Sequence, residues 1–181
     1  MRLNSLLQWD EKITTKLRLT DSQVRFKTAA AFFAHSGDSW FVLVGLFIIW
    51  LFTSGAWHHL TALMAGGTVG LALVVLAIKF TIRRRRPEGE WGAIYRNTDP
   101  HSFPSGHAAR AAMLAVLALV VGPAWLGVVL VIWGLLVSFA RVWMGVHYLS
   151  DIIAGILLGV LAGFVVLQLA PWLNATFPAI F

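Results

Sequence analysis

Two long stretches of this chain carry almost no charge, and they leave few folds open to it. Residues 39–78 contain no Asp, Glu, Lys or Arg, and residues 111–181 contain only Arg141 and Asp151. A helix needs about 20 apolar residues to cross the hydrocarbon core of a bilayer, and these stretches supply several such runs. The sequence therefore predicts an all-α fold, a polytopic membrane helix bundle with five to six transmembrane helices.

Composition and the placement of charge agree with a membrane protein. Charged residues make up 12% of the chain, which is about half their share in a soluble domain. The net charge is +6, and the basic residues concentrate in residues 1–27 and 79–110. Such clusters suit an anionic lipid surface or an anionic substrate. We expect no nucleic-acid partner, because so apolar a chain has little water-exposed surface, and the absence of cysteine excludes disulfides and thiolate chemistry.

Turn-forming residues and charges divide the chain into segments. Residues 3–19 have the amphipathic pattern of a helix that lies in the membrane interface, and residues 24–36 form a half-length or re-entrant segment. We expect an interfacial helical region at 1–37 and a transmembrane core at 38–181. The predicted spans are 39–54, 58–80, 105–121, 125–143 and 148–170, the last closed by Pro171. Close helix packing in lipid is favoured by the recurrent glycines Gly66, Gly67, Gly70, Gly155, Gly159 and Gly163.

Alternate crossing of the membrane would bring four segment ends to one side. These are the end of the second span, the start of the third, the end of the fourth and the start of the fifth. The polar connection 81–103 joins the second span to the third. The polar and ionisable residues that meet there are Lys79, Arg86, Ser105, His107, Arg141, His147 and Asp151.

The spacing of His147 and Asp151 suggests chemistry at this face. The two residues are four positions apart, which places them one turn apart on one helix face. The carboxylate can accept from one imidazole nitrogen and leave the other aimed at a substrate, as nucleophile or base. A polar pair that closes a helix end and a metal site are competing interpretations, but an ionisable residue beside a membrane segment is costly and functional by default.

The stretch HSFPSGHAAR, residues 101–110, predicts an anion site. Pro104 suits the first turn of a helix, and Ser105 and Gly106 leave free backbone N–H groups, which bind anions at a helix N-terminus. His107 stands in that turn, where a nearby phosphate would keep it protonated as a general acid. An ordinary helix cap is the alternative.

Three more residues are candidates for contact with an anion. Arg141 lies six positions before His147 and can bind an oxyanion through two N–H donors, unless it is a snorkelling arginine at a helix end. Arg110 shares a helix side with His107 and is a candidate contact for a lipid head group. His101 is a second such candidate, for which an ordinary loop position is the competing interpretation.

The basic run KFTIRRRRP begins with Lys79 and ends with Arg86 and Pro87. Lys79 and Arg86 are seven positions apart, which is two turns on one face if the helix continues that far. The remaining arginines, at 83–85, are assigned to a juxtamembrane cluster attracted to lipid phosphate.

Together the motifs resemble a known family. In chain order they are Lys79, six residues, Arg86-Pro87; Pro104-Ser105-Gly106-His107; and Arg141, five residues, His147, three residues, Asp151. This is similar to the three-part motif of the type-2 phosphatidic acid phosphatase superfamily, over about residues 36–165. The family usually has Ser immediately before the third-motif arginine, and this chain has Ala140 there, which bears on the fine positioning of Arg141.

The resemblance implies a role for each motif. His147 would attack phosphorus and form a phosphohistidine, Asp151 would orient it, and His107 would protonate the leaving oxygen. The phosphoryl oxygens would be held by Lys79, Arg86, Ser105, Gly106 and Arg141. No cofactor and no metal is implied, since cations and backbone amides supply the stabilisation that Mg²⁺ supplies elsewhere.

The expected function is that of a metal-independent, integral membrane lipid phosphate phosphatase. Its partners would be the bilayer and a lipid phosphate: undecaprenyl diphosphate, phosphatidylglycerol phosphate or phosphatidic acid, with a lipid A-type glycolipid as the alternative. A haloperoxidase-type oxidant is disfavoured because those relatives are soluble. A transporter that uses the polar cluster as an ion relay is the alternative of another class.

The expected location is the cell (inner) membrane, crossed several times. The resemblance favours an active site on the extracytoplasmic face. The positive-inside rule would place the arginine-rich face in the cytoplasm, but those arginines have a substrate role in this interpretation. Oligomeric state is left open by the sequence.

Overall fold

The computed structural model describes residues 3–19, 23–88 and 99–181. Within these ranges the chain is helical, and an isolated β-bridge joins Arg85 to His101. The helices are α1 (Leu3–Leu17), α2 (Val24–Ser36), α3 (Ser39–Phe52), α4 (Ala56–Ile82), α6 (Gly106–Val121), α7 (Ala124–Trp143) and α8 (Leu149–Thr176). The predicted all-α bundle is confirmed.

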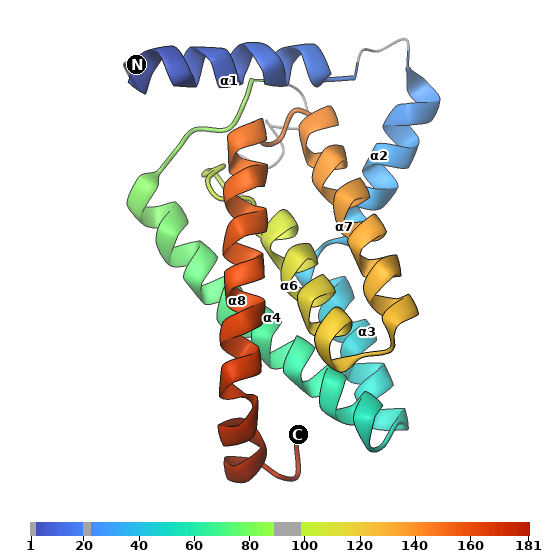
Figure 1. Cartoon of the computed structure of the whole chain (residues 1–181). Coiled ribbons are helices and arrows are strands. Elements are labelled where there is room, and N and C mark those ends of the chain that lie inside the picture. The colour runs from blue at the N-terminus through green and yellow to red at the C-terminus, as the bar shows by residue number, and fades with distance from the viewer. Residues whose placement is uncertain (1–2, 20–22, 89–98) are drawn as a thin grey trace.

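The helices run back and forth between two ends of the bundle, and α1 lies across one of these ends (Figure 1). The turns that join α3 to α4 and α6 to α7 lie at the opposite end, near the C-terminus. The end of α4, the start of α6, the end of α7 and the start of α8 therefore meet beneath α1. Alternation of long apolar helices brings the polar segments of the chain together at one end.

Helix α6 forms the centre of the bundle, because it packs against α4, α7 and α8. Small residues let α8 approach it closely. A Cβ on Gly159 would lie 2.0 Å from the carbonyl oxygen of Ala109, and one on Gly155 would lie 2.6 Å from that of Ser105. Gly163 meets the same helix one turn further on. The predicted role of glycine in close helix packing is confirmed for Gly155, Gly159 and Gly163, whereas an added Cβ on Gly70 would meet no atom within 4 Å.

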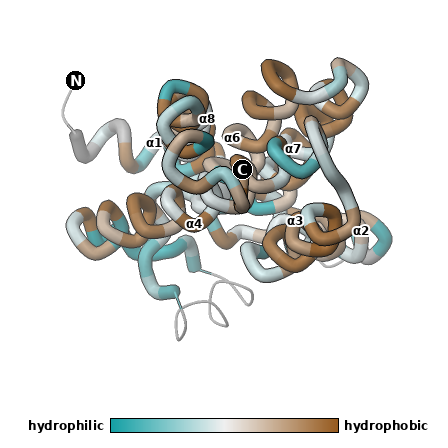
Figure 2. The backbone as a smooth tube through the Cα atoms, turned by 90° about the horizontal axis from the view of Figure 1, so that it is seen from below, coloured by the Kyte–Doolittle hydropathy of each residue, from teal (hydrophilic) through white to brown (hydrophobic). Residues whose placement is uncertain are grey.

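Three helices, α4, α7 and α8, are long and apolar enough to cross a membrane. Helices α2 and α3 together count as a fourth span, bent by 58° at the break between them. Helix α6 has 16 residues and is about 24 Å long, shorter than the hydrocarbon core. The expectation of five to six spans thus exceeds what length and hydropathy support, because α2 and α3 form one bent pair and the enclosed α6 is short. In Figure 2, brown, the colour of hydrophobic residues, marks much of the outer side of the helices.

Two helix boundaries differ from expectation. Pro171 lies inside α8, which continues to Thr176, because a backbone in apolar surroundings has no partners other than those of the helix itself. Helix α4 ends at Ile82, where Arg83 adopts a left-handed conformation with φ of 52°. Arg86 therefore does not continue the helix face of Lys79, and it reaches the same place from the connection.

Helix α2 packs on the end of α7 through small apolar side chains. Ala30 and Ala34 of α2 form one buried cluster with Ala140 and Met144. Ala140, the residue that departs from the family's usual Ser, is fully buried in this cluster. The division of the chain into regions 1–37 and 38–181 stays a prediction.

Candidate active site

The turn between α7 and α8 holds Arg141 and His147 in place. Helix α7 ends at Trp143, and Gly145 turns the chain with a positive φ of 65°, a conformation that glycine adopts without steric cost. The backbone N–H groups of Val146 and His147 then donate to the Arg141 carbonyl, at 3.1 and 3.3 Å. Arg141 and His147 are each only 1% exposed, so their polar atoms face protein rather than water.

His147 has a defined tautomer in this setting. Its Nε2 lies 3.2 Å from Nη1 of Arg86, and because a guanidinium only donates, Nε2 is the acceptor. The proton of the neutral ring is then on Nδ1, which lies 3.6 Å from Oδ2 of Asp151. Asp151 is held by the backbone N–H of Tyr148, which donates to the same oxygen at 2.9 Å.

The surroundings of His147 keep its ring neutral. Burial lowers the pKa of His147 well below its usual value, and the nearby cations Arg86, Arg141 and Lys79 lower it further. A neutral imidazole, whose Nε2 carries no proton, is the form that attacks an electrophile. The cations predicted to hold a phosphate thus also disfavour protonation of this ring.

Arg86 and Lys79 meet around the carboxylate of Asp99. Arg86 is 4% exposed and donates to the carbonyl of Val146 at 2.8 Å, and also to the carboxylate of Asp99 at 2.8 Å. Lys79, at the end of α4, donates to the same oxygen of Asp99. A carboxylate oxygen therefore lies between two cations predicted to hold phosphoryl oxygens. Sequence reasoning assigned no role to Asp99, because its partners depend on how the connection folds back.

The N-terminus of α6 is tied to the start of α8. Ser105 is the N-cap residue, and its Oγ accepts from the N–H of Ala108 at 3.4 Å. The backbone N–H of Ser105 donates to the carbonyl of Asp151 at 3.0 Å. Gly106 is the first residue of the helix and lines the same pocket as His107.

His107 has a carboxylate partner that the sequence did not reveal. Its Nε2 lies 2.8 Å from Oδ1 of Asp38, in the break between α2 and α3. The other oxygen of Asp38 lies 3.2 Å from Nδ1 of His35. The signal available in the sequence was Gly37-Asp38, a helix-breaking polar step between two apolar segments.

Arg110 and His101, the predicted head-group contacts, both line the pocket. Arg110 is buried and donates to the carbonyl of Gly37 and to Oγ of Ser39, so it fastens α6 to the break between α2 and α3. His101 is partly exposed and lies edge-on to Phe80, with ring centroids 5.7 Å apart. Contact of either residue with a head group stays a prediction.

The assignment of Arg84 to a lipid-attracting basic cluster is wrong. Its Nη1 donates to Oδ1 of Asp151 at 2.7 Å, and its Nη2 donates to Oδ2 of Asp10 at 2.8 Å. The side chain is 17% exposed. The end of α4 at Ile82 turns this arginine inward, which a count of basic residues does not reveal.

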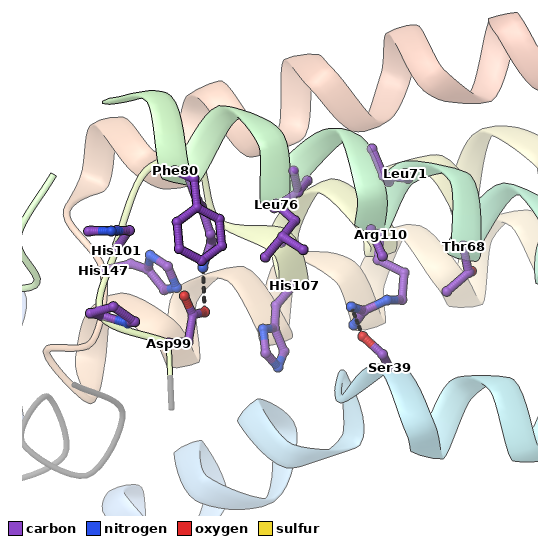
Figure 3. A pocket seen from close by; sticks show the side chains of 15 residues that line it. Ser39, Thr68, Leu71, Leu76, Phe80, Asp99, His101, His107, Arg110 and His147 are labelled. Atoms are coloured by element: carbon purple, nitrogen blue, oxygen red, sulfur yellow. Dashed lines mark hydrogen bonds and ion pairs between the residues drawn. The ribbon is translucent and has the colours of Figure 1, made fainter. Parts of the chain in front are cut away.

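A pocket of about 270 Å³ connects these groups (Figure 3). Its polar end holds His147, His101 and Asp99, with Lys79 beside them, and His107 lies further along. The rest of the wall is mostly apolar and comes from one face of α4: Thr68, Leu71, Ala72, Val75 and Leu76. A pocket of this shape suits a ligand with an anionic head and an apolar neighbouring part.

Metal ligands do not cluster in the described ranges of the chain. No three His, Asp or Glu side chains there converge as a metal-binding group. The ionisable groups that line the pocket are three histidines, the cations Lys79 and Arg110, and the carboxylate of Asp99. Such a set can bind an anion and move a proton.

Comparison with known proteins agrees with this chemistry. The family model described as the PAP2 superfamily matches residues 72–175, more than half of the chain. The undecaprenyl-diphosphatase of Sulfolobus acidocaldarius is 36% identical over 114 residues, which are 56% of this chain and 55% of that protein. Undecaprenyl-diphosphatase BcrC of Bacillus subtilis is 32% identical over 125 residues, 66% of this chain and 62% of that protein. The chain thus spans between half and two thirds of the length of these curated relatives.

A solved structure shares the whole bundle. The transmembrane PAP2 type phosphatidylglycerolphosphate phosphatase from Bacillus subtilis superposes with a TM-score of 0.76 and 25% identity. The match covers 94% of this chain and 89% of the other. With the apolar spans described above, this likeness makes the chain a multi-pass membrane protein.

Proposed function

The chain belongs to the PAP2 superfamily, and on that premise we propose that it is a membrane lipid phosphatase. It removes the terminal phosphate from a phosphomonoester or diphosphate of a membrane lipid. The observation that carries this proposal is the pocket that joins His147, Lys79 and His107 to an apolar wall of α4.

In the first step Nε2 of His147 attacks phosphorus, and the bond from phosphorus to the leaving oxygen breaks. His107 gives its proton to that oxygen, so the lipid leaves as a neutral alcohol or as a protonated lipid monophosphate. The phosphorylated ring keeps its proton on Nδ1 and becomes cationic. Asp151, 3.6 Å from Nδ1, balances this charge and holds the ring in orientation.

In the second step a water molecule attacks the phosphohistidine. His107, now neutral, accepts the proton of that water, and the bond between phosphorus and Nε2 breaks. Inorganic phosphate leaves, and both histidines return to their starting states. The sum is hydrolysis of one phosphate bond by one water molecule.

Lys79, Arg86, Arg141 and the backbone N–H groups behind Ser105 and Gly106 would hold the phosphoryl oxygens. Preorganised cations and dipoles of this kind stabilise the charge that develops in the transition state. Support comes from the burial of all three cations, since a desolvated cation acts more strongly on a nearby anion.

Undecaprenyl diphosphate is the first candidate substrate, because two relatives carry the name undecaprenyl-diphosphatase. Phosphatidylglycerol phosphate is the second, after the name of the superposed structure. Phosphatidic acid and a lipid A-type glycolipid complete the set. The terminal phosphate of each is an anion next to a long apolar chain, and the pocket offers complementary surfaces.

We place α6 across the membrane as a fifth span, in addition to α4, α7, α8 and the bent pair of α2 and α3. Support comes from its enclosure by neighbours, which shortens the apolar length that it needs. Helix α1 would lie in the interface above the site. The site would face the extracytoplasmic side of the inner membrane. Reporter fusions after residues 57 and 88 test this orientation, because position 57 lies in the first turn of α4 and position 88 follows the end of the same helix.

The deciding experiment is phosphate release by the purified protein in detergent from each of the four lipids. We expect release from at least one, and none from His147→Ala, which cannot form the covalent intermediate. His107→Ala should lose most activity on an alkyl phosphate and less on a nitrophenyl phosphate, whose leaving group needs less protonation. Acid-quenched protein should contain phosphohistidine. If the folded wild-type protein releases phosphate from none of the four lipids, the proposal is refuted. The hypothesis of a transporter with an ion relay would then be the one to test.

A further inference from the structure

Helix α1 is bound to the first turn of α8 at two backbone positions. The N–H of Leu149 donates to Oγ1 of Thr14 at 3.2 Å, and the N–H of Ser150 donates to Oδ1 of Asp10 at 3.1 Å. The first N–H groups of a helix have no partner within the helix itself. Here α1 supplies those partners, although it lies far from α8 in sequence.

The two residues that follow α1 extend its contacts along the turn that carries His147. Arg18 donates to the carbonyl of Glu88 at 2.6 Å and packs against Gly145. The N–H of Leu19 donates to the carbonyl of Trp143 at 3.0 Å. Helix α1, together with Arg18 and Leu19 directly after it, therefore contacts the outside of the α7–α8 turn at both of its ends.

Asp10 and Asp151 are joined through one arginine. Nη2 of Arg84 donates to Oδ2 of Asp10 at 2.8 Å, and Nη1 donates to Oδ1 of Asp151 at 2.7 Å. The guanidinium lies 4.0 Å from the centre of the Tyr148 ring. Asp10 and Asp151 are 7% and 0% exposed, so the carboxylates of both ion pairs are shielded from water. Charge pairs interact more strongly in such an environment than in water.

The two oxygens of Asp151 have different partners. Oδ1 accepts from Arg84, while Oδ2 accepts from the N–H of Tyr148 and faces Nδ1 of His147. A carboxylate is planar, so the position of Oδ1 sets the direction of Oδ2. Arg84 therefore holds the carboxylate in the plane in which it meets the imidazole, and Asp10 holds Arg84.

We propose that Asp10 and Arg84 are positioning residues, through which α1 sets the orientation of Asp151 and hence of His147. The inference rests on the proposed phosphatase function. Both terminal nitrogens of Arg84 donate to carboxylates, one to Asp151 and one to Asp10, so we assign neither Arg84 nor Asp10 a contact with the phosphate. Their loss should slow the attack of His147 and leave binding of the lipid phosphate nearly unchanged.

The test compares two pairs of variants in the full-length protein. Asp10→Asn keeps an oxygen for the N–H of Ser150 but removes the charge that holds Arg84, and its control is Glu11→Gln, the same charge change at an exposed position of α1. Arg84→Gln removes the link, and its control is Arg85→Gln, an exposed arginine next to it. Asp10→Glu and Arg84→Lys restore the charge.

We expect Asp10→Asn and Arg84→Gln each to lower kcat by about 10-fold, as loss of an outer-shell partner of a reactive group does, with KM within about twofold. The rate of phosphohistidine formation in a single turnover should fall by the same factor. Both controls should match the wild type, and the charge-restoring variants should recover part of kcat. The double variant Asp10→Asn/Arg84→Gln should have nearly the same kcat as Arg84→Gln alone, because both substitutions act through one contact.

Different results would contradict the proposed phosphatase function and the positioning role of Asp10 and Arg84. If the wild-type protein releases no phosphate from any lipid, the proposed function is wrong. If the wild-type is active but the losses fall on KM, equal those of the controls, or add independently in the double variant, the positioning role is wrong. Unfolding midpoints in the same detergent separate these outcomes from loss of structure. If Asp10→Asn unfolds, the result for Arg84→Gln decides whether the positioning role holds, because that variant keeps the hydrogen bonds between Asp10 and Ser150.

Discussion

Each of the two site histidines lies beside a carboxylate, but the two pairs differ in origin. Asp151 is four positions from His147, and the helix repeat alone relates them. Asp38 is 69 positions from His107 and reaches it only because α2 and α3 break at that point. In both pairs the carboxylate can balance the positive charge that the imidazole carries at one stage of the proposed reaction.

The depressed pKa of His147 predicts activity at mildly acidic pH. Only the neutral ring attacks, so kcat/KM falls as pH drops through the pKa of His147 in the free enzyme. Burial and the cations Arg86, Arg141 and Lys79 lower that pKa below the usual 6.5. The acidic limb of kcat/KM should therefore lie below pH 6.5, and in Arg86→Gln it should move to higher pH. A wild-type limb at or above pH 6.5 would contradict this account.

The position of Asp99 predicts that it competes with substrate. Its carboxylate pairs with both Lys79 and Arg86, the cations proposed to hold the phosphate, and its side chain is 41% exposed. Asp99→Asn should lower KM and the inhibition constant of inorganic phosphate by about fivefold, the effect of an ion pair worth about 1 kcal/mol. Glu88→Gln, an exposed acid on the same connection, should change neither. A higher KM in Asp99→Asn would instead mean that Asp99 keeps the two cations in place.

Among the helices, the contact of α6 with α8 leaves the least room for change. Substitution Gly159→Ala would place a methyl group 2.0 Å from the carbonyl oxygen of Ala109, and backbone cannot yield as a side chain can. We expect a loss of about 1–3 kcal/mol in stability, the usual effect of overpacking, read as a lower unfolding midpoint in detergent. Gly70→Ala in α4 is the control, since no atom lies within 4 Å of its added Cβ. Equal midpoints would show that the two helices separate at little cost.

The same contact positions the site. Gly155 lets the Ser105 carbonyl approach α8, and the N–H of Ser105 donates to the carbonyl of Asp151. The start of α6, with Gly106 and His107, is thereby fixed against the start of α8. Gly159→Ala should for this reason also lower activity of the folded protein.

Across the whole bundle, ionisable side chains and exposed apolar side chains occupy different regions. The ionisable residues of the described C-terminal half lie toward the end of the bundle that α1 covers, and much of the remaining surface exposes large apolar side chains. Electrostatic stabilisation of a phosphate would then come from Lys79, Arg86 and Arg141, which lie on separate segments.

This distribution of cations predicts activity without an added metal. Phosphate release should survive EDTA, because side-chain cations and backbone N–H groups supply the charge stabilisation. Vanadate, which mimics the phosphoryl group, should inhibit. Activity that requires added Mg²⁺ and disappears in EDTA would exclude the proposed mechanism.

The length and position of the uncharged apolar stretches by themselves determined the class of this protein, the approximate limits of most helices and the end of the bundle at which the ionisable residues meet. This succeeded because a helix that crosses a membrane must satisfy its backbone internally and must be apolar over a minimum length. The pair His147 and Asp151 and the N-terminus of α6 were predictable for a similar reason, since each depends on contacts within one or two turns.

Only the tertiary structure decided which charges meet. Asp38 with His107, Asp10 with Arg84, and Asp99 with Lys79 and Arg86 all join separate segments. Their pairing depends on a 58° break between α2 and α3, on the end of α4 at Ile82, and on α1 lying across the bundle. A buried charge needs a partner within a few ångströms, and that distance is set by packing in three dimensions, which a local sequence pattern does not encode.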